Sequence, residues 1–264
     1  MLRSPTRPLI TLGLLLAAAA AQAQAPDWKK IRIGVEGAYP PFSQIGPDGK
    51  VIGFEIDLAM AYCAYLKAEC TLVQQEFDGM IPALQSRKFD VIIASMSITE
   101  PRSKVIAFSV PYINNPAHFV GKANVPFTMT AAGLKGKRIG VQRSTTHAAY
   151  VKNTYTQSEV VLYATQDQIF LDLKAGRIDL ALADQVAIDT GFLSKPDGKG
   201  FAFVGEPVDG PIFGLGSGVG MRKSDAATLA PKFNAAIEAI SKDGTFKKIN
   251  AKYFPYSIDP RAKK

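Results

Sequence analysis

The sequence predicts an α/β protein made of two related lobes, each a mostly parallel sheet flanked by helices. The first observation is a repeat, because residues 32–35 (RIGV) recur as residues 138–141. The second is an alternation of apolar, strand-like runs with stretches of helical periodicity, typical of parallel sheets covered on both faces. The third is a spaced set that recurs in the same order, Asp78, Leu84, Lys88 and Asp90 against Asp167, Leu173, Arg177 and Asp179. A chance match between two ordinary α/β stretches remains the alternative.

Each copy of the repeat has the same order of elements. A short β-rich run opens it, at residues 31–35 and 138–141. Apolar residues at helical spacing follow within each copy. A second apolar run with strand character closes each copy, at residues 90–95 and 179–184.

Polar and charged residues follow these apolar strands. In open parallel sheets, ligands bind beyond the carboxyl ends of the strands. Two related lobes therefore imply a groove between them, lined by residues 36–39, 95–102, 142–147 and Asp184.

Arg102 lies in a segment suited to binding a carboxylate. Thr99 is placed to cap a helix whose first turn accommodates Pro101. Arg102 would then lie at the positive end of this helix, near the hydroxyls of Ser95 and Ser97. A guanidinium fork together with helix N–H groups is a good receptor for a carboxylate. A surface arginine is the alternative.

Residues 144–146 (STT) form a second strand-to-helix turn after the second RIGV strand. Free N–H groups in this turn, with Ser144 and Thr146, would give a second grip on the same carboxylate. A plain helix N-cap is the alternative.

Two carboxylates follow apolar strands, Asp184 and Glu36. Burying a carboxylate is costly unless it is paired, so Asp184 needs a partner, either a ligand ammonium or a protein Lys or Arg. Glu36 has a solvated surface position as its alternative. Two carboxylates facing one groove would favour a ligand with two positive charges. Tyr39 and Phe77 are candidate aromatic walls, with ordinary core packing as the alternative.

The first 23 residues are predicted to be a secretory signal sequence. Arg3 and Arg7 precede an apolar run at residues 9–21, and Ala23 closes a small-residue cleavage site. A membrane anchor is the alternative, but the run is shorter than the roughly 20 apolar residues that a spanning helix needs. No Cys stands directly after the cleavage site, at the new N-terminus, so we expect no lipid anchor.

Charge and motif content exclude several classes of protein. Cleavage after residue 23 leaves 29 basic against 23 acidic residues, a net charge of +6. The basic residues are spread along the chain, which favours a solvated surface over a nucleic-acid-binding stripe. There is no His-rich metal spacing, no GxSxG and no phosphate-binding loop, so we expect no metal, no cofactor and no catalytic residue.

Cys63 and Cys70 are expected to form a disulfide in an exported protein. On one continuous helix they would lie about 10.5 Å apart along the axis, too far for a bridge. The bridge therefore requires the helix to end near Lys67 and the chain to turn back by Cys70. Two unpaired, buried thiols are the alternative.

Four motifs make the chain resemble the periplasmic amino-acid-binding proteins of ABC importers, solute-binding protein family 3. The nearest group is that of the lysine/arginine/ornithine, histidine and opine binders. The resemblance extends over the mature chain, to residues 243–245 and 252–254. The motifs are VEGAYPPF at 35–42, GFEIDL at 53–58, FDGMIPAL at 77–84 and SMSITEPR at 95–102.

This resemblance implies the two-lobed periplasmic binding protein fold with two hinge crossings, near residues 113–120 and 206–213. After the signal sequence, residues 24–113 would form the first part of lobe 1. Residues 114–212 would form lobe 2, and residues 213–264 the second part of lobe 1.

The resemblance also implies roles for individual residues. Arg102, Ser97 and Thr146 would hold the α-carboxylate of an amino acid. Asp184 and Ser95 would hold its α-ammonium. The side chain would meet Glu36, Tyr39 and Phe77. Cys63 and Cys70 match the disulfide pair of the family.

Four positions depart from the lysine/arginine/ornithine pattern. Glu36 stands where Asp is frequent, Ala94 replaces a Ser, and Ser144 replaces a Gly. Gln142 replaces an apolar residue near the ligand. Opine binders also carry Glu at position 36, so an opine remains an alternative ligand.

The expected function is that of the periplasmic substrate-binding component of an ABC importer. It would bind arginine, ornithine, lysine or histidine by hinge closure and deliver it to a membrane permease. We expect a monomer that binds no nucleic acid and is not an enzyme. The alternatives are an opine binder and a periplasmic dehydratase on the same fold.

Overall fold

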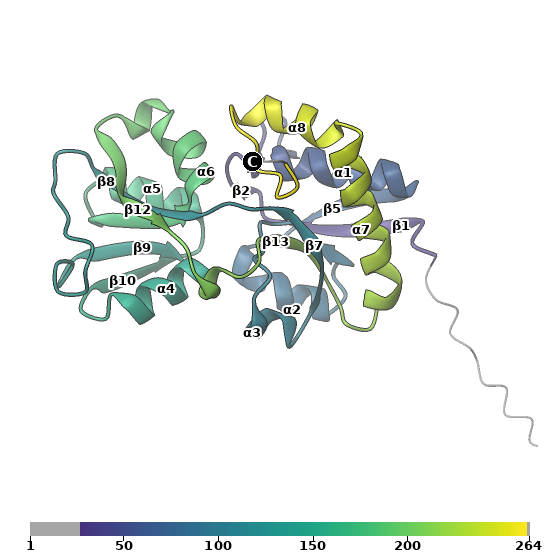
Figure 1. The fold of residues 1–264 in the computed structure, drawn as a ribbon, viewed down its shortest axis with the longest axis horizontal. Coiled ribbons are helices and arrows are strands. Elements are labelled where there is room, and N and C mark those ends of the chain that lie inside the picture. Colours follow the sequence, from purple (N-terminus) through teal and green to yellow (C-terminus); the bar gives the residue numbers. More distant parts are fainter. Residues whose placement is uncertain (1–26, 263–264) are drawn as a thin grey trace, which may run out of the picture.

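The computed structural model describes residues 27–262, so the predicted signal sequence at residues 1–23 lies outside the described residues. The chain forms two α/β lobes that lie side by side (Figure 1). The two-lobed α/β architecture predicted from the sequence is confirmed. No helix within residues 27–262 is both long and apolar enough to cross a membrane.

The first lobe is built on a five-stranded sheet of order β5-β1-β6-β13-β7. β5, β1 and β6 are parallel, and β13 is antiparallel to both neighbours, so four strands point the same way. A small antiparallel sheet, β2-β3-β4, completes the lobe. Its elements are β1 (Lys30–Val35), β2 (Ala38–Tyr39), β3 (Ser43–Ile45), β4 (Val51–Ile52), α1 (Phe54–Leu66), β5 (Glu69–Gln74), α2 (Met80–Gln85), β6 (Val91–Ile92), α3 (Glu100–Ser103), β7 (Ala107–Ile113), β13 (Ser217–Met221), α7 (Ala226–Lys242) and α8 (Thr245–Tyr253).

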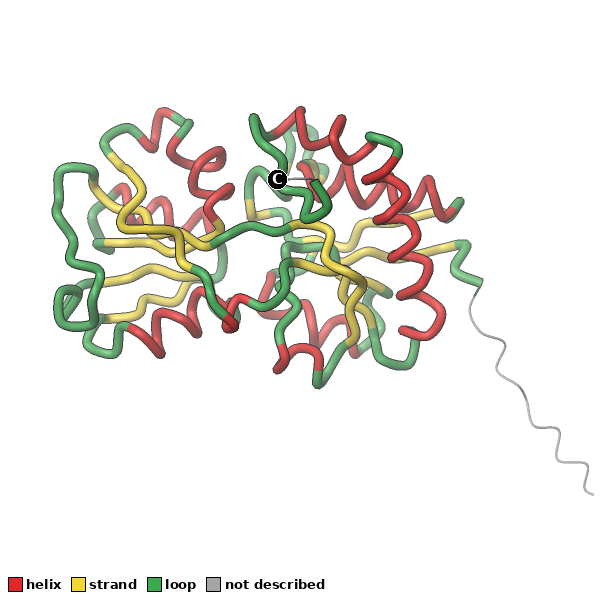
Figure 2. Tube along the Cα trace, in the orientation of Figure 1, coloured by secondary structure: helices red, strands yellow, loops and turns green. Residues whose placement is uncertain are grey.

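The second lobe repeats this plan in a sheet of order β10-β9-β11-β8-β12. Four strands again point the same way, and the reversed strand, β8, is again fourth in the order. Figure 2 shows helices flanking the strands of both lobes. The elements are β8 (Ala117–Lys122), β9 (Arg138–Gln142), α4 (Thr146–Thr154), β10 (Glu159–Tyr163), α5 (Gln166–Lys174), β11 (Leu180–Asp184), α6 (Gln185–Ile188) and β12 (Phe201–Val208).

The apolar runs in the sequence are buried on both faces of their sheets. Val91 and Ile93 pack into one core cluster of the first lobe, whereas Ile92 and Ala94 pack into another. The same alternation between two clusters holds over residues 180–183 of β11. Because both faces are covered, these strands are almost wholly apolar rather than alternating.

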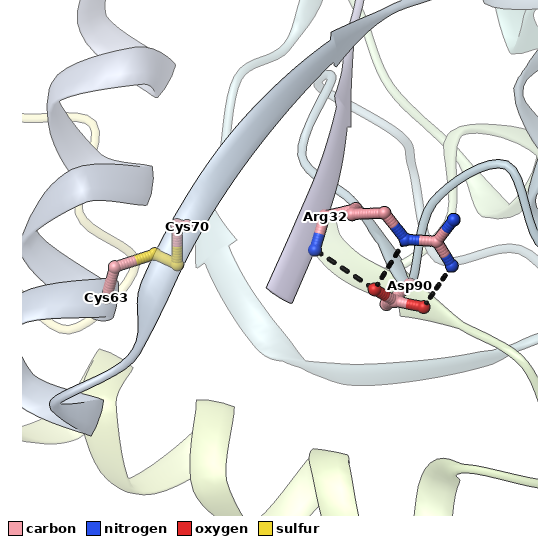
Figure 3. The surroundings of a disulfide bond; sticks show 4 residues. All are labelled: Arg32, Cys63, Cys70 and Asp90. Atoms are coloured by element: carbon pink, nitrogen blue, oxygen red, sulfur yellow. Dashed lines mark hydrogen bonds and ion pairs between the residues drawn. A yellow bond between two sulfur atoms is a disulfide. The ribbon is translucent and has the colours of Figure 1, made fainter. Parts of the chain in front are cut away.

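The sequence repeat corresponds to the same set of hydrogen bonds in each lobe. The Arg32 N–H donates to Asp90 Oδ2 at 3.0 Å, and the Asp90 N–H donates to the Arg32 carbonyl at 2.8 Å. In the second lobe, the Arg138 N–H donates to Asp179 Oδ2 at 2.8 Å, and the Asp179 N–H donates back at 2.8 Å. Figure 3 shows the first of these pairs, with the Arg32 guanidinium also on Asp90. The repeated Asp therefore fixes the start of the parallel strand pair.

The glycine of the repeated RIGV motif permits close packing in both lobes. A Cβ on Gly34 would lie 2.7 Å from the Phe89 ring, and one on Gly140 would lie 2.4 Å from Ile178 Cδ1. Any side chain at either position would clash, because carbon atoms pack at about 3.5–4.0 Å. The large side chain before each repeated Asp, Phe89 or Ile178, therefore fits only because the facing strand residue is a glycine.

Helix α1 ends where the disulfide requires it to end. Its last residue is Leu66, and Lys67 takes a left-handed conformation with φ of 53° that turns the chain back into β5. The Cα atoms of Cys63 and Cys70 are then 6.2 Å apart, and the two residues form a disulfide (Figure 3). The predicted bridge is confirmed.

Two segments connect the lobes, one between β7 and β8 and one between β12 and β13 (Figure 1). The first is shorter than expected, because β7 ends at Ile113 and β8 begins at Ala117. His118 belongs to β8 and stacks on Phe203 with ring centroids 4.2 Å apart, so it is a residue of the second sheet rather than of the crossing.

Candidate functional site

A cavity lies between the two lobes. Nine of the ten ligand-binding residues predicted from the sequence line it, and only Ser144 does not. Arg102 and Asp184 share this cavity, as a site for a zwitterion requires. The lining comprises Glu36, Tyr39, Phe77, Ala94, Ser95, Ser97, Arg102, Gln142, Thr145, Thr146, His147 and Asp184.

The sheet topology explains why these residues meet. Glu36 follows β1, Ser95 follows β6, and Gln142 and Asp184 are the last residues of β9 and β11. The carboxyl ends of parallel strands lie at one edge of a sheet, and the two sheets turn these edges toward each other. Groups from both lobes therefore converge on one space.

Arg102 is held by backbone carbonyls and forms no ion pair within the described residues. Its Nη1 donates to the Ser97 carbonyl at 3.0 Å, and its Nη2 donates to the Ser144 carbonyl at 3.1 Å, across the cleft. The guanidinium also lies over the Phe77 ring, 5.4 Å from the centroid. Burial lowers the pKa of Arg102 to about 10, so the side chain stays charged at neutral pH. Its remaining N–H donors can bind an anion.

Helix α3, which carries Arg102, begins at the predicted place. Thr99 is its N-cap residue and Pro101 lies in its first turn. The Thr99 side chain makes no capping hydrogen bond, so this part of the expectation is wrong. The helix has only four residues, so its dipole acts on a ligand charge only close to its N-terminus.

Ser95 is fixed by a buried carboxylate that the sequence reasoning missed. Glu55, at the start of α1, accepts hydrogen bonds from the Ser95 N–H at 2.6 Å and from its hydroxyl at 3.0 Å. The Tyr112 hydroxyl also donates to Glu55. Burial raises the pKa of Glu55 to about 7, although these donors act in the opposite direction. Because the Ser95 hydroxyl proton is used, its oxygen can offer only an acceptor to a ligand.

The strand-to-helix turn of the second lobe forms as predicted. Thr145 caps α4 by accepting from the Ala148 N–H at 3.1 Å, and its hydroxyl donates to the Gln142 carbonyl at 2.6 Å. Ser144 has a φ of 62°, a conformation that favours glycine. Thr146 lines the cavity, whereas Ser144 contributes its carbonyl to Arg102.

Asp184 is paired with a tyrosine of the other lobe rather than with a Lys or Arg. The Tyr39 hydroxyl donates to Asp184 Oδ2 at 2.7 Å. His147 Nε2 lies 3.5 Å from Asp184 Oδ1. Burial, with the neighbouring Asp184 carboxylate, raises the pKa of Tyr39 well above its usual value, so the hydroxyl remains a donor.

Glu36 is buried, with 4% of its surface exposed, and meets an amide of the other lobe. Gln142 Nε2 lies 2.5 Å from Glu36 Oε1 and 3.0 Å from the Ala164 carbonyl. Burial raises the pKa of Glu36 to about 8, although the hydrogen bond from Gln142 lowers it. Without a compensating positive charge, this carboxyl group is largely protonated at neutral pH.

The sequence reasoning placed the strand ends correctly but missed contacts between segments far apart in the chain. Thr145 lies in the predicted 142–147 segment and lines the cavity, although it was not one of the ten predicted ligand-binding residues, and Glu55 lies behind Ser95. The first turn of α1 carries two carboxylates, Glu55 and Asp57, and nothing local in the sequence shows that Glu55 is the buried one. Within residues 27–262, no group of three or more His, Cys, Asp or Glu side chains could hold a metal ion.

Comparison with known proteins places this architecture in one family. The family model of bacterial extracellular solute-binding proteins, family 3, matches residues 31–256. The chain is 44% identical to the L-arginine-binding protein of Pseudomonas aeruginosa, over 94% of this chain and 97% of that protein. It is 40% identical to the lysine/arginine/ornithine-binding periplasmic protein of Escherichia coli, over 96% and 98% of the two chains.

A solved structure agrees with these sequence matches. An ancestral arginine-binding protein bound to arginine is 36% identical to the chain, with a TM-score of 0.78. The match covers 86% of this chain and 98% of the other. The resemblance inferred from the motifs is confirmed, and the chain belongs to the bacterial extracellular solute-binding proteins, family 3.

Proposed function

We propose that this protein is the periplasmic substrate-binding component of an ABC importer and that it binds a cationic amino acid. The observation that carries the proposal is the charge pattern of the cleft. A partly buried guanidinium without an ion-pair partner among the described residues shares one cavity with two carboxyl groups, one from each lobe. An α-amino acid with a basic side chain matches this pattern, because its carboxylate complements the guanidinium and its two cationic groups complement the two carboxyl groups.

The α-carboxylate would bind at Arg102. This guanidinium has N–H donors that the Ser97 and Ser144 carbonyls leave free, and the Thr146 hydroxyl lines the same space. Charge-assisted hydrogen bonds to a carboxylate are shorter and roughly twice as strong as neutral ones. Arg102 has no ion-pair partner within residues 27–262, so its partly buried charge is available to an anionic ligand.

The α-ammonium would bind between Asp184 and Ser95. Both groups face the cavity with acceptor oxygens, because Tyr39 holds Asp184 as an acceptor and Glu55 takes the Ser95 hydroxyl proton. An ammonium supplies up to three donors and no acceptor, which matches this set.

The basic side chain would extend toward Glu36. Tyr39 and Phe77 line the same cavity and offer apolar surface to a methylene chain. A cation there would favour the ionised form of Glu36 and lower its pKa from about 8. Binding would therefore release a proton at neutral pH.

Closure of the two lobes would couple binding to transport. Arg102 and Glu36 belong to lobe 1, and Thr146 and Asp184 to lobe 2, so a bound ligand bridges the lobes and favours the closed state. In this proposal residues 24–113 and 213–264 move as one body and residues 114–212 as the other. A membrane permease would distinguish the loaded receptor by this closed shape.

The names of the relatives support this proposal. They describe periplasmic proteins that bind arginine, lysine, ornithine or histidine. We propose the same compartment for this chain, and binding without catalysis. Incubation with prephenate or arogenate should yield no product, and turnover of either compound would favour the dehydratase alternative.

Calorimetric titration tests the proposal. The protein should bind at least one of arginine, ornithine, lysine and histidine, and more weakly a neutral amino acid such as leucine. Arg102→Ala should reduce every affinity by about 100-fold or more, the effect of truncating a buried charged contact. Arg87→Ala, which removes an exposed arginine outside the cleft, is the matched control. Unchanged affinity in Arg102→Ala would refute the carboxylate site.

A further inference from the structure

The inner end of the cavity contains an amide whose orientation is fixed by its neighbours. The same nitrogen of Gln142 approaches Glu36 Oε1 at 2.5 Å and the Ala164 carbonyl at 3.0 Å. A carbonyl oxygen can only accept, so the Gln142 atom facing Ala164 must be the NH₂ nitrogen. Both N–H donors of the amide are thereby used, one by Glu36 of lobe 1 and the other by the Ala164 carbonyl of lobe 2.

This orientation leaves the amide oxygen available. Within the described residues, no group donates to Gln142 Oε1, and none donates to Glu36 Oε2. Neither atom belongs to the buried polar atoms that lack a partner, so both retain exposed surface. Gln142 and Glu36 both line the cavity, and that exposed surface lies on two buried residues, one from each lobe.

The free oxygens belong to two side chains that are hydrogen-bonded to each other, and a planar donor with several N–H groups can bind both. A guanidinium presents its N–H donors in a rigid fork and spreads its charge over three nitrogens, whereas an ammonium is compact and strongly hydrated. A neutral amide oxygen beside the carboxylate adds a hydrogen bond that the fork can use without a second full charge.

We propose that Gln142, together with Glu36, forms a two-oxygen acceptor for a guanidinium group and makes the protein select arginine over lysine and ornithine. This inference rests on the proposed function, because it assigns the preferred ligand of the same cleft. It also gives a physical role to the glutamine that replaces an apolar residue of the lysine/arginine/ornithine pattern.

The selectivity arises from how well the donors of each ligand satisfy the free oxygens of Glu36 and Gln142. The rigid fork of arginine can donate to both oxygens at once, whereas lysine and ornithine present a compact, strongly hydrated ammonium without such a fork. A site built to accept a hydrogen bond discriminates against ligands that lack the donor. L-citrulline, which has the shape of arginine but a neutral urea group, places an oxygen where a donor is required and should bind at least 100-fold more weakly than arginine.

The test measures the affinity ratio between arginine and lysine in the wild type and in Gln142→Met, which keeps the side-chain length and removes the amide. The affinity for arginine should fall about 10- to 100-fold, as expected for the loss of a hydrogen bond to a charged group. The affinity for lysine and ornithine should change less, so the ratio should fall at least tenfold. Gln142→Leu provides a second variant, and Gln85→Leu, an exposed position on α2, is the control.

The outcomes separate this inference from the proposed function. Equal losses for arginine and lysine, or an unchanged ratio, would overturn the role of Gln142 and leave a cationic amino-acid binder. A wild type that binds no cationic amino acid would overturn both. Thermal unfolding of each variant without ligand confirms that it is folded, and a variant that is not folded is replaced by the other.

Discussion

The two lobes share a framework but differ in the charged groups that surround it. In lobe 1 the repeated Asp90 is held by the side chains of both Arg32 and Arg222, and its own side chain is 11% exposed. In lobe 2 the corresponding Asp179 has, within residues 27–262, a single ion-pair partner, Lys137 at 3.5 Å, and its side chain is 31% exposed. The same backbone motif therefore carries a largely buried aspartate with two arginine partners in lobe 1 and a partly exposed aspartate with one lysine partner in lobe 2.

The lobes differ in the same way at the cleft. Lobe 1 contributes the Arg102 guanidinium, which forms no ion pair in the described part of the chain, and the buried Glu36, whereas lobe 2 contributes Asp184 and the amide of Gln142. Neither set alone matches a zwitterion with a basic side chain. The repeat explains why each lobe folds and where its strands end, and the residues outside the repeat explain what the pair of lobes can bind.

The largest expected effect concerns the repeated aspartates. Asp90→Ala should lower the free energy of unfolding by about 3–5 kcal/mol, because it leaves the buried Arg222 without one of its carboxylates. Asp179→Ala should cost about 1 kcal/mol, since its partner is more exposed. Urea unfolding of both variants measures the difference, and equal costs would contradict the contrast between the lobes.

The disulfide is a second difference, because it lies only in lobe 1. Cys63→Ser with Cys70→Ser should lower the free energy of unfolding by about 2–3 kcal/mol, as expected for opening so short a loop. The bridge lies outside the cavity lining, so the dissociation constant for arginine should stay within about twofold. Calorimetry alongside thermal unfolding checks both, and a large loss of affinity would show that the lobe 1 framework is coupled to the cleft.

Binding of a cationic ligand should strengthen as the pH rises toward 8. The pKa of Glu36 is about 8, raised by burial with further contributions from Glu55, Asp167 and Glu76. The protonated form is thus favoured in the folded protein, and a cationic ligand requires the ionised form. Below pH 8 the affinity should rise up to tenfold per pH unit and level off above it.

Glu36 makes the stability of the ligand-free protein fall as the pH rises, whereas it makes ligand affinity increase. An acid whose pKa is raised on folding stabilises the ligand-free protein below its unfolded pKa, near 4.5, and this contribution is lost as the pH rises through about 8. Glu36→Gln should remove both dependences. Titrations at several pH values test this, and an affinity that is flat from pH 6 to 8 in the wild type would contradict the assignment.

The smallest expected effect concerns ion pairs that join the lobes beside the cavity. Arg143 of lobe 2 lies 2.8 Å from Glu76 and 2.6 Å from Asp78 of lobe 1. These groups are partly exposed, so Arg143→Ala should cost about 0.2–1 kcal/mol of affinity, equally for all ligands. The cost should shrink at high salt, and a ligand-specific effect would place Arg143 in the site itself.

The sequence alone predicted the parts of the fold that depend on local pattern. Apolar runs buried on both faces located β1, β9 and β11, and the polar residue after each run marked the cleft, as for Glu36 and Asp184. The disulfide was expected because an exported chain carries two cysteines, and helical rise then required α1 to end near Lys67, as it does. These inferences succeed because strand burial and helix geometry depend on residues that are close together in the sequence.

Contacts between distant segments could not be predicted in this way. The bond from Gln142 to Glu36 joins residues 106 positions apart, and that from Ser95 to Glu55 joins residues 40 apart. Nothing in either local pattern encodes the partner. The extent of β6, only two residues of the longer apolar run, also depends on which neighbours it meets.

A crystal structure of the protein with L-arginine would test the central claim most directly. The account predicts the α-carboxylate within hydrogen-bond distance of the Arg102 guanidinium and the α-ammonium within hydrogen-bond distance of Asp184. The ligand guanidinium should lie between Glu36 and Gln142. Arginine bound in the reverse direction, or outside the space between the lobes, would contradict it.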